Sequence, residues 1–139
     1  YGAITTNAGT PFERRLELIY DDLNLLMGKF HPEAMSIEKL FYNTNAKTVI
    51  DVAQARGVTV LAAKKNNIPI FEYTPLQVKQ SGVGYVRAVQ KTVQEMTRII
   101  LKLAKIPKPD DTADALAMAI CHAHASGSLM GKLNSMGIR

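Results

Sequence analysis

Two carboxylates stand three residues apart at the start of an apolar, helix-like segment. Asp111 and Asp114 precede a run of apolar positions that includes Leu116, Met118 and Ile120. Residues three apart share a helix face, so we expect the two side chains to project side by side. Like charges held together repel each other unless a cation sits between them, and Mg²⁺ or Mn²⁺ is the usual cation for oxygen ligands. The spacing therefore predicts a divalent-metal site.

An alternative interpretation of this segment needs no metal. Asp110 is then an N-cap, and the other two acids complement the positive end of the helix dipole. The spacing alone does not separate these two interpretations.

Glu38 favours the metal site. It follows the short segment Ala34–Ile37, which we predict to be a buried strand after a helix that Pro32 ends. Open α/β sheets place their ligand sites at the carboxyl ends of strands. A strand-end Glu beside a helix with two Asp predicts a cluster of three carboxylates. The alternative is an exposed Glu38 that pairs with Lys39 or with solvent.

The elements that position these acids follow from the apolar patterns. Thr10, Pro11 and Glu13 predict a helix start with a capping box. Apolar residues then recur at steps of three and four as far as Phe30, a stripe expected to face a sheet. Further predicted elements are a helix over 45–65, a strand over 68–73, a short helical turn from Thr74, a helix over 87–104 and the carboxylate helix over 110–125.

Length and composition favour one domain over residues 1–125, followed by a flexible tail over 126–139. The chain has 139 residues, of which 47% are hydrophobic, and a formal net charge of +5. This mild positive charge is compatible with a polyanionic partner. No apolar run reaches the 18 or so residues of a membrane span, and the start has no signal-peptide pattern. A single cysteine fits a reducing compartment, so we expect a cytoplasmic protein.

His122 and His124 lack the spacing of a metal-binding pair. Residues two apart on a helix point to different faces, and no Cys or His partner stands at ligand spacing. We expect ordinary surface or partly buried histidines, and a buried, inert thiol at Cys121.

Seven short motifs occur in a fixed order along the chain. They are Ser36-Ile37-Glu38-Lys39-Leu40-Phe41, Asn43-Thr44-Asn45, Gln54-Ala55-Arg56-Gly57, Pro69-Ile70-Phe71-Glu72-Tyr73, Gln77-Val78-Lys79-Gln80, Val93-Gln94-Glu95-Met96 and Asp111-Thr112-Ala113-Asp114-Ala115-Leu116-Ala117. Together they resemble the RuvC family of Holliday-junction resolvases, the crossover junction endodeoxyribonucleases. The resemblance covers residues 1–125.

The resemblance implies an α/β fold of the ribonuclease-H-like class, with a mixed sheet flanked by helices. In this family four acidic residues hold two Mg²⁺ ions, for which Mn²⁺ can substitute. Three of the four match here as Glu38, Asp111 and Asp114. The fourth is an Asp in an Asp-Pro-Gly motif on the first strand, and this sequence does not contain that motif. Because Tyr1–Thr6 resembles the family's third strand, we expect an N-terminally truncated fold without the first two strands.

The resemblance also implies residues that contact DNA. Phe41 matches an aromatic residue associated with the junction crossover, and the alternative for it is a core phenylalanine. Lys79 matches a lysine on the DNA-facing side, and Arg87 and Lys91 are further candidates for phosphate contacts. Gln90 stands where the family often has lysine, a change that we expect to weaken one phosphate contact.

The function expected from the resemblance is that of a metal-dependent endonuclease. As a homodimer it would resolve four-way DNA junctions by paired symmetric nicks, in recombination and repair, together with the branch-migration motor RuvA and RuvB. The helix over 45–65 would contribute to the homodimer interface. The alternative is a catalytically inactive junction-binding remnant, because the first-strand Asp is absent from this sequence. A third hypothesis is a related protein that processes other branched DNA.

Overall fold

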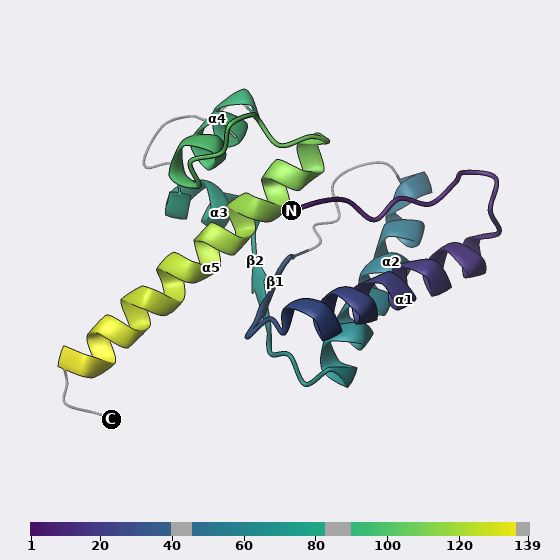
Figure 1. The fold of residues 1–139 in the computed structure, drawn as a ribbon, viewed down its shortest axis with the longest axis horizontal. Coiled ribbons are helices and arrows are strands. Elements are labelled where there is room, and N and C mark those ends of the chain that lie inside the picture. Colours follow the sequence, from purple (N-terminus) through teal and green to yellow (C-terminus); the bar gives the residue numbers. More distant parts are fainter. Residues whose placement is uncertain (40–45, 83–89, 136–139) are drawn as a thin grey trace. The chain divides into compact units, whose positions relative to one another are not determined.

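The computed structural model describes residues 1–39, 46–82 and 90–135, with side chains except at 46–47, 79, 82, 90–92 and 128–135. Within these ranges the chain forms helices and two short strands (Figure 1). In chain order they are α1 (Phe12–Phe30), β1 (Met35–Glu38), α2 (Ala46–Lys65), β2 (Ile70–Tyr73), α3 (Pro75–Gly82), α4 (Gln90–Ile100) and α5 (Asp110–Ser135).

The chain forms two compact units. The α1–α2 unit comprises Gly2–Met35 and Leu40–Phe71, and the α3–α5 unit comprises Tyr1, Ser36–Lys39 and Glu72–Arg139. Glu38 and both carboxylates of α5 therefore belong to the α3–α5 unit. The division of the chain into a domain over 1–125 and a tail stays a prediction.

The two strands pair in parallel. Met35 N donates to Pro69 O at 2.9 Å, and Lys39 N donates to Tyr73 O at 2.9 Å. The offset between the bonded residues is the same at both ends, which is the register of parallel strands. Parallel strands need a long crossover, and α2 is part of it. Glu38 and Tyr73 end their strands at the same edge of the sheet.

The α1–α2 unit is held together by the packing of α1 on α2. Ala62 and Ala63 of α2 have no exposed surface, and their small side chains let the two helices approach closely. On α1, Asn24 Oδ1 accepts a hydrogen bond of 2.6 Å from Asn66 Nδ2. The buried core consists of Met27, Ala62, Ala63 and Ile68, surrounded by the partly buried Tyr20, Leu23, Met35 and Ile70.

The end of α2 delivers Ile68 to this core. Asn67 has a left-handed backbone with φ 57°, and its N–H donates to Lys64 O at 3.1 Å. The next N–H, that of Ile68, donates to Ala63 O at 3.0 Å. These two bonds form a Schellman motif, which satisfies the last helical carbonyls. It also turns the chain so that Ile68 lies buried in the core.

The start of α1 differs from its prediction. Pro11 occupies the N-cap position, and within the described residues no side chain hydrogen-bonds the start of this helix. Thr10 stands one position before the N-cap, too early to serve the free N–H groups of the first turn. The capping box predicted from Thr10 and Glu13 is therefore wrong. At the other end, His31 is left-handed and its N–H donates to Met27 O at 2.9 Å.

The apolar stripe of α1 is only partly covered by the described residues. Phe12, Leu16 and Leu23 are half-buried, whereas Phe30 is 67% exposed. The described sheet contains β1 and β2 alone. The expectation that the whole stripe faces a sheet is therefore not met along the C-terminal turn of α1.

A capping box occurs instead at α3. Thr74 N donates to Gln77 Oε1 at 2.8 Å, and Gln77 N donates to Thr74 Oγ1 at 3.1 Å. This reciprocal pair satisfies two backbone donors at the start of the helix. It fixes the point where the chain leaves β2 and enters α3.

Helix α5 contacts both α3 and α4 (Figure 1). Its small buried residues allow close packing, and α4 contributes Val93 and Thr97 to the same interior. Among the α5 residues whose side chains are described, the buried ones are Thr112, Ala113, Ala117, Met118, Ile120 and Cys121.

Helix α5 is longer than its prediction. It continues to Ser135, so the predicted end near Ala125 is wrong. Gly127 costs about 1 kcal/mol relative to alanine in a helix interior, which is not enough to stop a long helix. Ser126 Oγ donates to Ala123 O at 3.1 Å, as serine often does inside a helix. Among residues 1–39, 46–82 and 90–135, none of the helices has the length and apolar character needed to cross a membrane.

Two further predicted elements differ from the structure. Helix α4 ends at Ile100 rather than Ala104, because left-handed Lys102 starts a Schellman motif in which Leu103 N donates to Arg98 O at 2.9 Å. Tyr1–Thr6 forms no strand within the described residues. A strand needs a hydrogen-bonding neighbour, and the described sheet pairs β1 and β2 only with each other.

We predict that Met27→Ala destabilises the α1–α2 unit. Met27 is 6% exposed in the core, and truncation of a buried Met to Ala costs about 2–5 kcal/mol because a cavity remains. Urea unfolding measures the loss. Leu25→Ala is the matched control on the same helix, because Leu25 is 68% exposed and its truncation should change stability by about 0.5 kcal/mol or less. Equal losses for the two variants would contradict the assignment of this core.

Candidate functional site

Glu38 lies where its prediction places it, at the carboxyl end of a strand. It is the last residue of β1 and its side chain is exposed. The backbone immediately after it is fixed, because Lys39 N donates to Tyr73 O at 2.9 Å. The strand end therefore presents the Glu38 carboxylate from a defined backbone position.

Asp111 and Asp114 lie near the start of α5, and both side chains are exposed. Their neighbours Thr112 and Ala113 are buried, so the backbone that carries the two acids is anchored on its inner side. Asp110 is the first residue of the helix, which puts the N-cap position at Pro109 rather than at Asp110. Acids in a first turn interact favourably with the helix dipole, whether or not a metal is bound.

The donor chemistry of these residues suits a hard divalent cation. Glu38, Asp111 and Asp114 offer carboxylate oxygens, the ligands that Mg²⁺ prefers. The structure brings all three to one compact unit. In the part of the chain that it describes, however, no group of three or more His, Cys, Asp or Glu side chains lies close enough together to hold a metal ion. The metal-binding role of the three residues stays a prediction.

The predicted DNA contacts fall mostly outside the described atoms. Phe41 and Arg87 lie outside the described residues. Lys79 lies in α3 and Lys91 in the first turn of α4, and neither side chain is described. Gln90 is the first residue of α4. Their DNA-binding roles stay predictions.

Sequence reasoning missed a hydrogen bond between β2 and α5. The Tyr73 hydroxyl and His122 Nδ1 are 2.7 Å apart, and the two residues are 49 positions apart in the chain. Their rings are tilted by 56° with centroids 5.9 Å apart. The signal that could have indicated Tyr73 is its place at the end of a predicted strand, the same kind of position from which Glu38 was chosen.

Two further contacts tie α5 to α3. His124 Nδ1 lies 2.8 Å from Ser81 O, and because a carbonyl only accepts, the histidine nitrogen donates. Cys121 Sγ donates to Gln77 O at 3.7 Å. The sequence predicted that Cys121 is buried, and the structure confirms this. The histidines are partly buried and exposed, as expected, but both are hydrogen-bonded.

The phenol of Tyr73 has a perturbed pKa. Its burial raises the pKa above the ordinary value of 10.0, and the neighbouring Cys121 raises it further. Burial disfavours the phenolate, and a second group that becomes negative does the same. The neutral hydroxyl is thus the form that this site favours.

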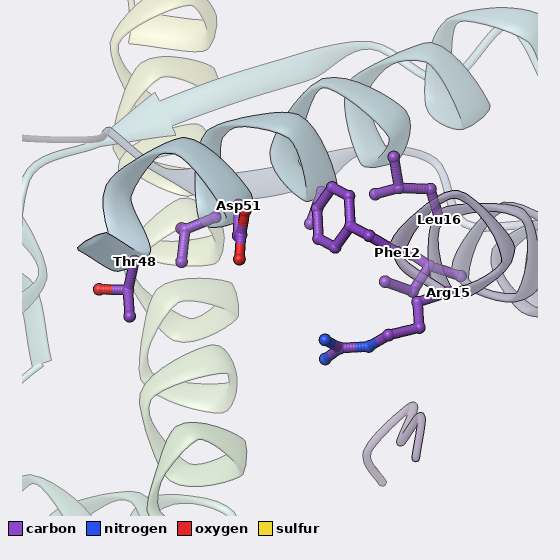
Figure 2. A pocket seen from close by; sticks show the side chains of 8 residues that line it. Phe12, Arg15, Leu16, Thr48 and Asp51 are labelled. Atoms are coloured by element: carbon purple, nitrogen blue, oxygen red, sulfur yellow. The ribbon is translucent and has the colours of Figure 1, made fainter. Parts of the chain in front are cut away.

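A pocket of about 320 Å³ lies in the α1–α2 unit. Figure 2 shows Phe12, Arg15 and Leu16 of α1 lining it together with Thr48 and Asp51 of α2. Arg15 Nε donates to Thr6 Oγ1 at 2.8 Å, which engages part of the guanidinium. The pocket is largely apolar and contains none of the predicted site residues.

Known proteins resemble this chain over nearly its whole length. A family model described as "Crossover junction endodeoxyribonuclease RuvC" matches residues 1–122. The RuvC of Ruminiclostridium cellulolyticum is 58% identical over 133 residues, which are 94% of this chain and 80% of that protein. The RuvC of Clostridioides difficile is 53% identical over 137 residues, which are 99% of this chain and 80% of that protein.

Solved structures give the same result. The Thermus thermophilus RuvC structure matches with a TM-score of 0.81 and 32% identity, over 90% of this chain and 75% of that one. The structure of T. thermophilus RuvC in complex with Holliday junction substrate matches with a TM-score of 0.78 and 29% identity, over 97% of this chain and 78% of that one. These matches confirm the predicted α/β, ribonuclease-H-like fold class.

We predict that Tyr73 makes the stability of the protein depend on pH in the alkaline range. Because its pKa is raised on folding, the folded chain keeps a proton that the unfolded chain loses. The contribution is complete below about pH 10 and is lost as the pH rises through the raised folded pKa. Urea unfolding between about pH 9 and pH 11 should show a steeper loss for the wild type than for Tyr73→Phe. Parallel pH profiles would contradict the prediction.

Proposed function

Because this chain belongs to the RuvC family of crossover junction endodeoxyribonucleases, we propose that it resolves four-way DNA junctions by paired symmetric nicks, as a metal-dependent homodimer. The observation that carries the proposal is the match to a RuvC solved with a Holliday junction substrate, over 97% of this chain. The acids that the resemblance assigns to the reaction also lie at a strand end and a helix start of one unit.

In this proposal Glu38, Asp111 and Asp114 hold Mg²⁺. Glu38 contributes a carboxylate ligand from the end of β1. Asp111 and Asp114 contribute theirs from exposed positions three residues apart near the start of α5. A divalent cation, when bound, polarises the scissile phosphoryl group and offsets the negative charge that develops on the attacking and leaving oxygens. The buried neighbours of the two Asp keep their backbone in place during the reaction.

Basic residues on the α3–α5 unit position the DNA. Lys79 on α3 and Lys91 on α4 would contact phosphates, with Arg87 as a further contact. Such contacts set the register of the substrate and carry no sequence information. Phe41 would stack on a base at the junction crossover, since aromatic stacking accepts any base. The net charge of +5 supports a polyanionic substrate.

Helix α2 supports the proposed homodimer. Ile50 and Leu61 are 64% and 52% exposed and share one helix face, being three turns apart. Between them lies Gly57, where an added Cβ would meet no atom within 4 Å. This exposed face with large apolar side chains is the kind of surface that a second copy covers. Cooperation with the motor RuvA and RuvB, and a cytoplasmic location, are proposed from the family alone.

The inactive-remnant alternative uses the same fold and the same basic residues. It differs in one respect only, which is that junction binding occurs without cleavage. Cleavage assays on a synthetic four-way junction, with and without Mg²⁺, separate the two proposals.

We predict that Asp114→Asn removes Mg²⁺-dependent cleavage and leaves junction binding intact. Loss of a residue that only supports a metal ligand costs about 10–100-fold, so loss of a ligand itself should exceed about 100-fold. Single-turnover cleavage and gel-shift binding measure the two properties. Asp110→Asn is the matched control, because Asp110 is a neighbouring acid outside the predicted set. Equal losses in both variants would show that helix-dipole charge, not metal ligation, is what matters.

We also predict that Leu61→Arg disrupts the homodimer. A charge placed in the apolar face of α2 would be buried against the second copy without a partner. Sedimentation equilibrium should show a dimer for the wild type and a monomer for the variant. Leu25→Arg makes the same change on α1, at a site that is 68% exposed, and should stay dimeric. A monomeric wild type at all concentrations would refute the proposed dimer.

A further inference from the structure

Tyr73 contacts the two elements that carry the candidate carboxylates. Its backbone carbonyl accepts a hydrogen bond of 2.9 Å from Lys39 N, directly after Glu38. Its side-chain hydroxyl lies 2.7 Å from His122 Nδ1, on the helix that carries Asp111 and Asp114. One residue therefore joins the end of β1 to α5, through main chain on one side and side chain on the other.

His122 lies on the same helix as two of the carboxylates, so its hydrogen bond to Tyr73 can restrain their position. It follows Asp111 by eleven residues. At 3.6 residues per turn these residues lie on nearly the same face, about three turns or 16 Å apart along the axis. A helix is a rigid element over such a length, so fixing His122 also fixes the direction in which the first turn presents its two acids.

Neighbouring contacts make the attachment of α5 firm. His124 donates to Ser81 O at 2.8 Å, and Cys121 donates to Gln77 O at 3.7 Å. Both acceptors lie on α3, whose start is fixed to the end of β2 by the capping box between Thr74 and Gln77. The segment from Tyr73 to Ser81 thus holds α5 at three successive points.

We propose that Tyr73 is a positioning residue for the proposed nuclease reaction: its hydroxyl, through His122, sets the position of Asp111 and Asp114 relative to Glu38. The inference rests on the proposed function. Active-site groups must be held within about 0.5 Å of their working positions, and a 1 Å misplacement can cost about 100-fold in rate. Tyr73→Phe removes this restraint, keeps the ring and the backbone bond to Lys39, and substitutes none of the three carboxylate residues.

A simple stabilising role for this hydrogen bond makes a different prediction. It would lower the melting temperature and leave the chemistry of the folded protein unchanged. A positioning role instead changes the cleavage rate and the affinity for a divalent ion, at temperatures where the protein remains folded. Junction affinity should stay the same in both cases, because no DNA contact is assigned to Tyr73.

The experiment compares the wild type, Tyr73→Phe and Tyr1→Phe. Tyr1 is 74% exposed, so its variant controls for the loss of a phenolic hydroxyl. Three quantities are measured: single-turnover cleavage of a synthetic four-way junction with Mg²⁺, junction affinity, and Mn²⁺ affinity by electron paramagnetic resonance. We expect cleavage and Mn²⁺ binding to fall about tenfold in Tyr73→Phe alone, as for other residues that orient metal ligands, with junction affinity unchanged.

Two substitutions at His122 test the path of the effect. His122→Asn places an amide near the position of Nδ1 and should preserve much of the activity, whereas His122→Ala should match Tyr73→Phe. The double variant Tyr73→Phe/His122→Ala should be no worse than either single variant, because both remove the same interaction. Additive losses would show that the two residues act separately and would overturn the proposed path.

The outcomes separate this inference from the proposed function. Equal cleavage and Mn²⁺ affinity in wild type and Tyr73→Phe would overturn the positioning role and leave the nuclease proposal standing. If the wild type binds the junction without cutting it, the nuclease proposal fails, and Mn²⁺ affinity alone decides the inference. Weaker Mn²⁺ binding in Tyr73→Phe then supports it, while equal binding, or no binding by any of the proteins, overturns it.

Discussion

The parallel pairing of β1 with β2 holds the carboxyl ends of both strands at one edge of the sheet. A hydrogen bond from Lys39 N to Tyr73 O closes this edge, next to Glu38. Parallel strands cannot be joined by a tight turn, so the chain between them must make a long crossover that includes α2. The same pairing that places Glu38 therefore also places α2 in the crossover, where its buried residues Ala62 and Ala63 pack on α1.

Local backbone motifs at the helix ends serve this arrangement. The Schellman motif after α2 brings Ile68 into the core just before β2 begins, and the capping box at Thr74 and Gln77 starts α3 just after β2 ends. Both motifs satisfy backbone groups that a helix end leaves unpaired. They also leave few conformations open to the four-residue strand between them. Tyr73 thus ends β2 with its side-chain hydroxyl hydrogen-bonded to His122 of α5.

The accuracy of the sequence predictions depended on whether the signal was local. The helix over 45–65, the strand before Glu38 and the start of the carboxylate helix are found as expected, because each depends on patterns within one or two turns. The pattern Thr-x-x-Glu at residue 10 suggested a capping box that the structure lacks, whereas Thr-x-x-Gln at residue 74 forms one. The motif determines which side chains are able to cap the start of a helix. The direction in which the chain enters the helix decides whether they do so.

The helix ends were harder to predict than the helix starts. Gly127 and Ser126 suggested that α5 stops early. Their cost to helix stability is small, however, and buried residues nearer the start of α5 anchor this long helix. The segment 1–6 resembles a strand in sequence, yet strand formation depends on a neighbour that no local pattern supplies.

The sequence by itself determined the spacing of Asp111 and Asp114, the strand-end place of Glu38 and the family to which the chain belongs. The spacing and the strand-end place follow from helical and strand periods, and the family follows from the resemblance of the seven motifs. None of these needs knowledge of distant contacts. Only the tertiary structure decided that Tyr73 lies against His122, 49 residues away. It also decided that the carbonyl of the same tyrosine binds the strand that carries Glu38. Contacts over such separations depend on how whole elements pack. Because elements pack by burying surface from many residues at once, no single motif predicts these contacts.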